Sequence, residues 1–113
     1  MFEHKAPGDK RTNLFGGVGT VEVWNLMGAA QMPPFHAALA CTLSPGGNVG
    51  KHVQQEAAEI VICLSGRGEA RVNDKPCALR PFDVVHLPLG ATLAIANLSP
   101  TEELHYLIVK AGS

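Results

Sequence analysis

Turn-forming residues divide this chain into short apolar segments, and their spacing constrains the fold more than any other feature. Twelve glycines and eight prolines fall between runs rich in Val, Leu, Ile and Ala. No stretch longer than about two turns shows the apolar period of a helix. The runs instead recur roughly every 8–12 residues, a spacing typical of β-sandwiches and β-barrels. We therefore predict an all-β fold.

The strands can be assigned from alternation, β-branched residues and turn residues. Residues 1–13 lack an apolar pattern and are expected to form an N-terminal arm, followed by a single domain over residues 14–113. The pair Asn73-Asp74 predicts a hairpin turn. About eight to ten strands are expected in all, and nine have definite ranges: 20–27, 35–43, 52–54, 60–64, 69–72, 77–79, 84–87, 92–96 and 104–109.

Composition and charge exclude several classes of function. The chain has 9 Lys and Arg against 10 Asp and Glu, a net charge of -1, so it lacks the basic excess of a nucleic-acid-binding protein. No apolar run approaches the roughly 20 residues of a membrane-spanning helix. The first twelve residues contain no apolar signal segment, so we expect a cytoplasmic protein. Three scattered cysteines at positions 41, 63 and 77 are interpreted as reduced core thiols.

One segment carries a specific spacing of polar residues and glycines. Between residues 46 and 66, His52 lies six positions after a glycine, Gln54 follows two positions later, and Glu59 lies seven positions before another glycine. This arrangement resembles the first motif of the cupin superfamily, G-x5-H-x-H-x(3,4)-E-x6-G, with Gln54 in place of the second histidine. His52 and Gln54 share one face of a strand because side chains alternate along it. Glu59 reaches the same point only if the chain bends between them.

A second segment resembles the other cupin motif, G-x5-P-x-G-x2-H-x3-N. Over residues 82–97, Pro88, Gly90 and Asn97 match this pattern, whereas Phe82 replaces the first glycine and Leu93 replaces the histidine. The resemblance implies a small antiparallel barrel of the jelly-roll type, with the motif residues facing inward. The superfamily includes isomerases, epimerases, dioxygenases, decarboxylases, lyases and proteins that only bind, so the resemblance indicates fold more strongly than activity.

The resemblance also implies a metal site. The four ligand positions of the family are occupied here by His52, Gln54, Glu59 and Leu93. An imidazole, an amide oxygen and a carboxylate suit Zn, Mn, Fe or Ni, and three protein ligands suffice for many catalytic sites. The iron facial triad needs two histidines, so dioxygenase chemistry is disfavoured. The alternative is a metal-free polar cluster of the same three residues.

Other residues are candidates for the rim and wall of the barrel cavity. His86, His105 and His36 are interpreted as surface or rim residues, with His86 the strongest candidate to complete the site. Cys63 shares the parity of Glu59 on one strand and is interpreted as a core residue that could also line the cavity. The predicted apolar lining consists of Val61, Leu93 and Ile95, with Phe35 or Tyr106.

These observations support three hypotheses. The first is a protein that binds a divalent metal through His52, Gln54 and Glu59, together with a small organic ligand in the barrel lumen. The second is a metal-free isomerase or lyase in which Glu59 and His52 are the catalytic residues and transfer protons. The third is a binding module without chemistry. We also expect a homodimer, in which the strand over residues 20–27 pairs with the partner's sheet.

Overall fold

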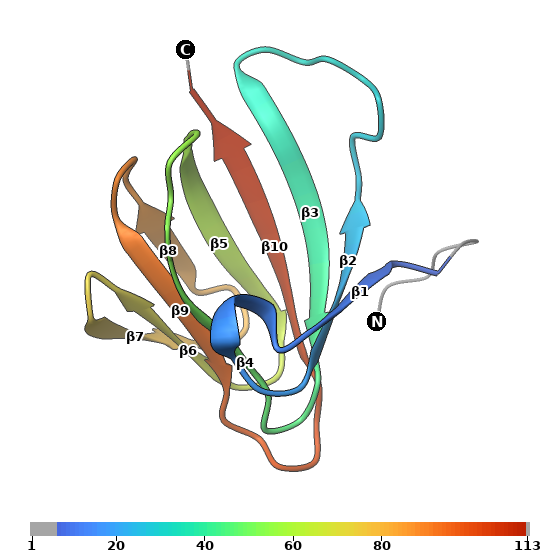
Figure 1. Ribbon diagram of the computed structural model, residues 1–113, viewed down its shortest axis with the longest axis vertical. Helices are drawn as coiled ribbons and strands as arrows, with labels where there is room; N and C mark the ends of the chain where they lie inside the picture. Colours follow the sequence, from blue (N-terminus) through green and yellow to red (C-terminus); the bar gives the residue numbers. More distant parts are fainter. Residues whose placement is uncertain (1–6, 113) are drawn as a thin grey trace.

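The computed structural model describes residues 7–112, and this part of the chain contains ten strands and one short 3-10 helix. The all-β prediction is confirmed, since each of the nine predicted ranges overlaps a strand, although the range 52–54 covers only the last two residues of β4 (Figure 1). The elements in chain order are β1 (Asp9–Thr12), η1 (Leu14–Gly16), β2 (Thr20–Asn25), β3 (Phe35–Leu43), β4 (Asn48–Val53), β5 (Ala58–Ser65), β6 (Gly68–Val72), β7 (Lys75–Leu79), β8 (Val84–Leu87), β9 (Thr92–Asn97) and β10 (Leu104–Ala111).

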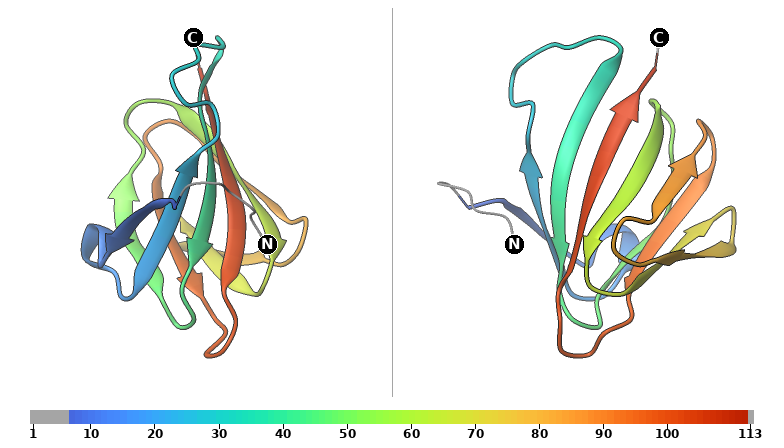
Figure 2. Two further views of the ribbon diagram at one scale, coloured as in Figure 1. Left: turned by 90° about the vertical axis from the view of Figure 1, so that its right-hand side faces the viewer. Right: turned by 180° about the vertical axis from the view of Figure 1, so that it is seen from behind.

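The strands form two antiparallel sheets that face each other. One sheet has the order β1-β2-β3-β10-β5-β8 and the other has the order β4-β9-β6-β7. Figure 2 shows the two layers from the side and from behind. Neighbours such as β3 and β10 are far apart in sequence, which is the connectivity of a jelly-roll barrel. The described residues include no helix long and apolar enough to cross a membrane.

The N-terminal arm contains one element that the apolar pattern did not reveal. Residues 9–12 form β1, which pairs with β2 and makes one edge of the larger sheet. The first six residues of the arm lie outside the described residues. Within the described residues, β1 pairs with Thr20–Val23 of β2 and β3 pairs with the other side, so most of β2 is already hydrogen-bonded within the chain. The expected dimer contact through this strand stays a prediction.

Alternation along the strands builds the core between the sheets. On β5, Glu59, Val61 and Cys63 point inward and are buried, while the residues between them are only partly covered. The same period places Leu104 and Tyr106 of β10 inside. The hairpin between β6 and β7 turns at Asn73 and Asp74, both with positive φ, as the turn residues predict.

Two local features position the polar residues of the barrel. The pairing of β4 with β9 shifts register between Val49 and His52, so β4 bends where its polar face begins. Beyond β4, the backbone of Gln54 exchanges hydrogen bonds with Gly90 and Ala91, which ties this segment to the turn before β9. The chain then re-enters the larger sheet at β5, and this reversal supplies the bend that Glu59 requires.

Candidate functional site

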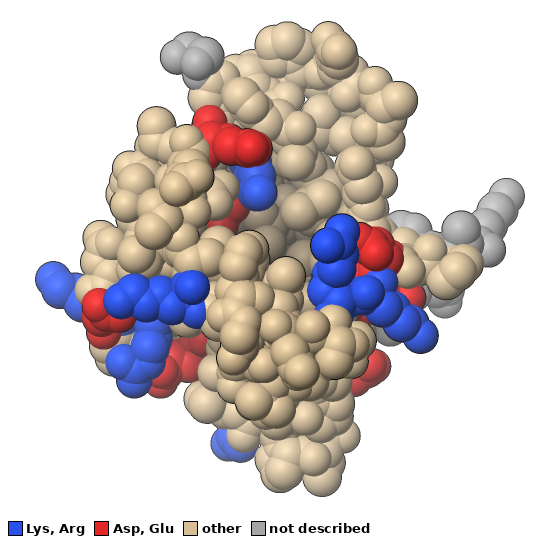
Figure 3. Space-filling view, in the orientation of Figure 1, with Lys and Arg blue, Asp and Glu red and all other residues tan. Residues whose placement is uncertain are grey.

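A cavity of about 330 Å³ lies between the two sheets and opens to solvent. Its lining includes five residues predicted from the sequence: His52, Gln54, Glu59, Leu93 and Ile95. Tyr106, one of the two alternatives for the aromatic wall, also lines it. Figure 3 shows a hollow near the centre of one face of the molecule, with acidic and basic side chains beside it. The structure thus brings the residues of the first motif together at one concave site.

The buried polar end of the cavity is built around Gln54 and Glu59. The Gln54 Nε2 atom donates a hydrogen bond of 2.9 Å to Glu59 Oε2, and the two residues are 6% and 3% exposed. Burial raises the pKa of the Glu59 carboxyl group, and the nearby positive charge of Lys110 partly offsets this effect. Lys110 is the register partner of Glu59 across β5 and β10, so both side chains point inward. This end therefore combines a buried acid, an amide and a cation.

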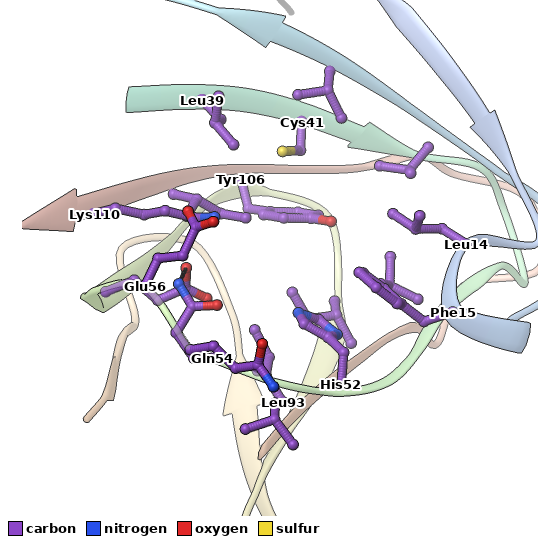
Figure 4. Close-up of a pocket in the computed structure, with 18 residues that line it drawn as sticks. Leu14, Phe15, Leu39, Cys41, His52, Gln54, Glu56, Leu93, Tyr106 and Lys110 are labelled. Atoms are coloured by element: carbon purple, nitrogen blue, oxygen red, sulfur yellow. Dashed lines mark hydrogen bonds between the residues drawn. The ribbon is translucent and has the colours of Figure 1, made fainter. Parts of the chain in front are cut away.

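His52 lies on β4, in the four-stranded sheet, and two contacts hold its ring. Its Nδ1 atom is 3.0 Å from the carbonyl oxygen of Gly50, an arrangement in which Nδ1–H donates and Nε2 carries the free lone pair. Its ring stacks on Phe15, with ring centroids 4.1 Å apart and an angle of 13° between the planes. Figure 4 shows His52 and Gln54 on the same side of the cavity. The imidazole is therefore held at the cavity wall by contacts on its edge and its face.

Phe15 reaches this position because η1 packs closely on β4. A Cβ atom at Gly50 would collide with the backbone oxygen of Phe15, so only glycine permits this approach. Asn48 holds the residues after η1 in place. Its side-chain Oδ1 accepts a hydrogen bond from the backbone amide of Val18, and its backbone amide donates one to the Val18 carbonyl oxygen. Leu14 and Phe15 both line the cavity. The sequence prediction missed them because a two-residue apolar segment has no period.

Tyr106 and Cys41 form a buried pair on the wall made by the larger sheet. Tyr106 is 2% exposed and shares a side-chain hydrogen bond with Cys41. Burial raises the pKa of the Cys41 thiol to about 12, so the thiol stays protonated at neutral pH. Cys41 is therefore a buried part of the cavity wall.

The period-2 pattern of β10 could have identified Lys110 as a lining residue, because it shares the parity of Tyr106 and Ile108.

Three predicted lining residues lie elsewhere. Val61 and Cys63 point inward on β5 but are fully buried in the core and do not line the cavity. His86 lies on the solvent side of β8, because its neighbour Leu87 takes the inward position beside Glu59. Inward parity did not bring Val61 and Cys63 to the cavity, because both side chains are fully covered by the core cluster of buried residues. The structure does not bring these residues to the site.

The remaining candidate histidines and Phe35 are also outside the cavity. His105 is bonded through Nδ1 to the Thr42 hydroxyl group at 3.0 Å, on the outer face of the larger sheet. His36 Nε2 lies 3.2 Å from the carbonyl oxygen of Gly112, near the end of β10. Phe35 is half exposed on the loop side of β3. His36 is exposed, as the surface interpretation expects, whereas the His105 side chain is only 12% exposed and is largely covered on the outer face of the sheet.

The possible metal ligands at the site are few. Within residues 7–112, no group of three or more His, Cys, Asp or Glu side chains is arranged to hold a metal ion. The cavity offers the Nε2 atom of His52, the free Oε1 atom of Gln54 and the Glu59 carboxylate. Leu93, the register partner of His52, is 1% exposed and has no donor atom. The donor set is thus one nitrogen and two kinds of oxygen.

Known proteins resemble this chain in sequence and in structure. The family model described as Cupin domain matches residues 39–110. The oxalate-binding protein of Thermotoga maritima is 30% identical over 102 residues, which span 89% of this chain and 84% of that protein. The crystal structure of a predicted oxalate decarboxylase from the same organism superimposes with a TM-score of 0.86 at 27% identity, covering 95% of this chain and 93% of the other. A cupin-like protein from Thermotoga maritima shares the fold, with a TM-score of 0.79 at 22% identity over 97% of this chain and 81% of its own.

Proposed function

Because this chain belongs to the cupin domain family, we propose that it binds a small organic molecule, together with a divalent metal ion, in the cavity between its sheets. The observation that carries this proposal is the meeting of His52 with the buried Gln54–Glu59 pair on the wall of one cavity. A concave, mostly apolar site with a few converging polar groups is the usual form of a small-molecule site. The name of the relative, an oxalate-binding protein, supports an organic acid as the ligand.

Three side chains that line the cavity carry donor atoms of the kinds that bind divalent ions. His52 Nε2 is free because Nδ1 faces Gly50, and Gln54 Oε1 is free because Nε2 donates to Glu59. Such a nitrogen and oxygen set suits Zn, Mn, Fe or Ni. A bound ion would supply positive charge that polarises a carboxylate or carbonyl oxygen of the ligand. Leu93 has no atom that could coordinate the ion, so a coordination position stays open for the bound organic molecule.

Metal analysis tests this part of the proposal. Plasma mass spectrometry of untagged protein, purified without chelator, is expected to find about one equivalent of a transition metal. The double variant His52→Ala, Glu59→Ala should lose it, while the matched double variant His86→Ala, Glu102→Gln, whose changes lie outside the cavity, should retain it. Less than about a tenth of an equivalent in the wild type, even after Zn, Mn, Fe and Ni are offered, would contradict metal binding.

A second candidate function is proton transfer without a metal. The specific observation in its favour is the raised pKa of the buried Glu59 carboxyl group, a property of many general acids and bases. In this case Glu59 would exchange a proton with the ligand, and His52 would act as its partner in an isomerase or lyase reaction. A screen of metabolites for turnover tests the idea: Glu59→Gln should abolish any activity found. Undiminished activity in that variant would reject the role of Glu59, and a lack of turnover would leave a binding protein.

Assembly and location are separate proposals. We propose that the chain forms a homodimer, with the edge strands β1 and β8 of the larger sheet as the open edges among the described residues. Sedimentation at micromolar concentration checks this, and a mass near the monomer value of 11.9 kDa would refute it. The cytoplasmic location stays a prediction that cell fractionation can test.

A further inference from the structure

The wall of the cavity is far more apolar than binding of a small diacid requires. Gln54, Glu59 and Lys110 lie together at one end, as Figure 4 shows for the first and last of these, whereas His52 lies beside Phe15. Most of the remaining wall is aliphatic, and it includes Leu14, Val21, Val23, Leu39, Val49 and Ile95. A ligand that covers this wall must itself carry apolar surface, because polar atoms placed against it would lose their hydrogen bonds to water.

The size of the cavity agrees with its chemistry. A water molecule occupies about 30 Å³ in the liquid, so the cavity of about 330 Å³ corresponds to roughly eleven water-sized groups. Oxalate has only about six non-hydrogen atoms, all of them in polar groups, and would fill about half of this space. A ligand that fills the cavity therefore has a polar head and an apolar body.

The head group can be placed by charge. Among the described residues that line the cavity, Lys110 is the one Lys or Arg, and it faces the buried pair from β10. Glu56, at the rim, is exposed to solvent, which screens its charge. An anionic head group is therefore best accommodated at the Lys110 end. The apolar body then extends toward the other end of the cavity, where Figure 4 shows Leu14 and Phe15.

Phe15 forms the end of the cavity that the body would contact. Its ring covers one face of His52, and its backbone is held in the left-handed region, with φ 53° and ψ 35°. The side chain is 55% exposed, so one face of the ring contacts the site while the other faces solvent. A side chain in this position limits the length of any molecule that enters.

From these observations we infer that the ligand is a monocarboxylic acid with an apolar body of several carbon atoms, and that Phe15 determines how long that body can be. This inference rests on the proposed function and names the ligand class for the same cavity. The carboxylate lies at the Lys110 end, and the body packs against the aliphatic wall as far as Leu14 and Phe15.

Titrations with a series of acids, followed by amide chemical shifts in NMR spectra, test the ligand class. The probes are acetate, butanoate, hexanoate and phenylacetate, with oxalate and succinate as diacids, each added to protein as purified with its metal content measured in parallel. Affinity for the monoacids should rise about fourfold per added methylene group until the cavity is full. Hexanoate should therefore bind more tightly than either diacid.

A matched pair of phenylalanine variants tests the role of Phe15. Octanoate is added as a longer probe: in the wild type the rise in affinity with chain length should stop where the body reaches Phe15, and in Phe15→Ala it should continue to the longer acid at about fourfold per methylene group. Phe82→Ala is the control, because Phe82 also has a positive φ, is 81% exposed and lies away from the cavity. It should bind every acid as the wild type does.

The outcomes separate this inference from the proposed function. Tightest binding of oxalate or succinate, or an affinity that does not rise with chain length, overturns the ligand class while leaving an acid-binding cavity in place. Equal effects of Phe15→Ala and Phe82→Ala overturn the role of Phe15. A wild-type protein that binds none of the acids removes both the inference and the proposed organic-acid ligand.

Discussion

Asn97 joins three segments of the barrel and should be among its most important single side chains for stability. Its Nδ2 donates to the carbonyl oxygens of Leu43, Ser44 and Glu102 at 3.1, 3.1 and 2.8 Å. Its Oδ1 accepts from the Ser99 amide at 2.9 Å, and the residue is 4% exposed. Replacement by alanine removes all four contacts and leaves buried carbonyl groups without this donor.

The cost can be estimated from these contacts. An amide has two N–H bonds, so the three donor contacts count as about two hydrogen bonds and the acceptor as a third, each worth about 1 kcal/mol. With the penalty for the stranded Leu43 carbonyl, Asn97→Ala should lower the free energy of unfolding by about 3–4 kcal/mol. For a chain of this size that corresponds to a fall in Tm of roughly 12–16 °C.

Guanidinium chloride unfolding, followed by far-ultraviolet circular dichroism, measures this change. The midpoint should fall while the slope m stays constant. Asn25→Ala is a suitable control, because Asn25 Oδ1 accepts from the Met27 and Gly28 amides at exposed positions, where water can replace it. Its cost should stay within about 0.5 kcal/mol. A loss below about 1 kcal/mol for Asn97→Ala would refute the reasoning.

Three further predictions concern the cavity and its surroundings. Because burial raises the pKa of Glu59 above its ordinary value of 4.5, the wild type loses stability as the pH rises through the folded-state pKa. Glu59→Gln should therefore raise Tm at pH 7–8 but not near pH 4, when melting is measured with chelator present; a pH-independent difference would contradict this. Gly50→Ala should displace Phe15 and cost about 1–3 kcal/mol, and an unchanged His52 ring signal in NMR spectra would argue against it. Iodoacetamide at pH 8 should label the half-exposed Cys77 before Cys41, whose pKa is about 12, and equal rates by mass spectrometry would disprove the burial argument.

The strands and the first motif could be predicted because both depend on local chemistry. Asn and Asp adopt positive φ more readily than other non-glycine residues, so the pair Asn73-Asp74 between two apolar runs marks a hairpin turn without knowledge of the rest of the chain. The two-residue period likewise put His52, on β4, and Gln54, directly after it, on the same side of the chain, and both line the cavity. The bend that brings Glu59 to them was left open by the residues and was supplied by the family resemblance.

The composition of the cavity wall depended on contacts that no local pattern encodes. Val61 and Cys63 share the inward parity of Glu59, but whether an inward residue meets a cavity or the opposite sheet depends on how far apart the sheets lie at that point. Phe15 enters the site through a close approach of η1 to Gly50, a contact between segments 35 residues apart in the chain.

The sequence by itself therefore determined the fold class and the central polar residues of the site, because alternation, turn chemistry and motif spacing act over a few neighbouring residues. Only the tertiary structure decided that Lys110 faces Glu59, that Phe15 stacks on His52 and that His86 faces solvent. These outcomes depend on strand register and on the separation of the two sheets, which are set by the packing of the whole barrel.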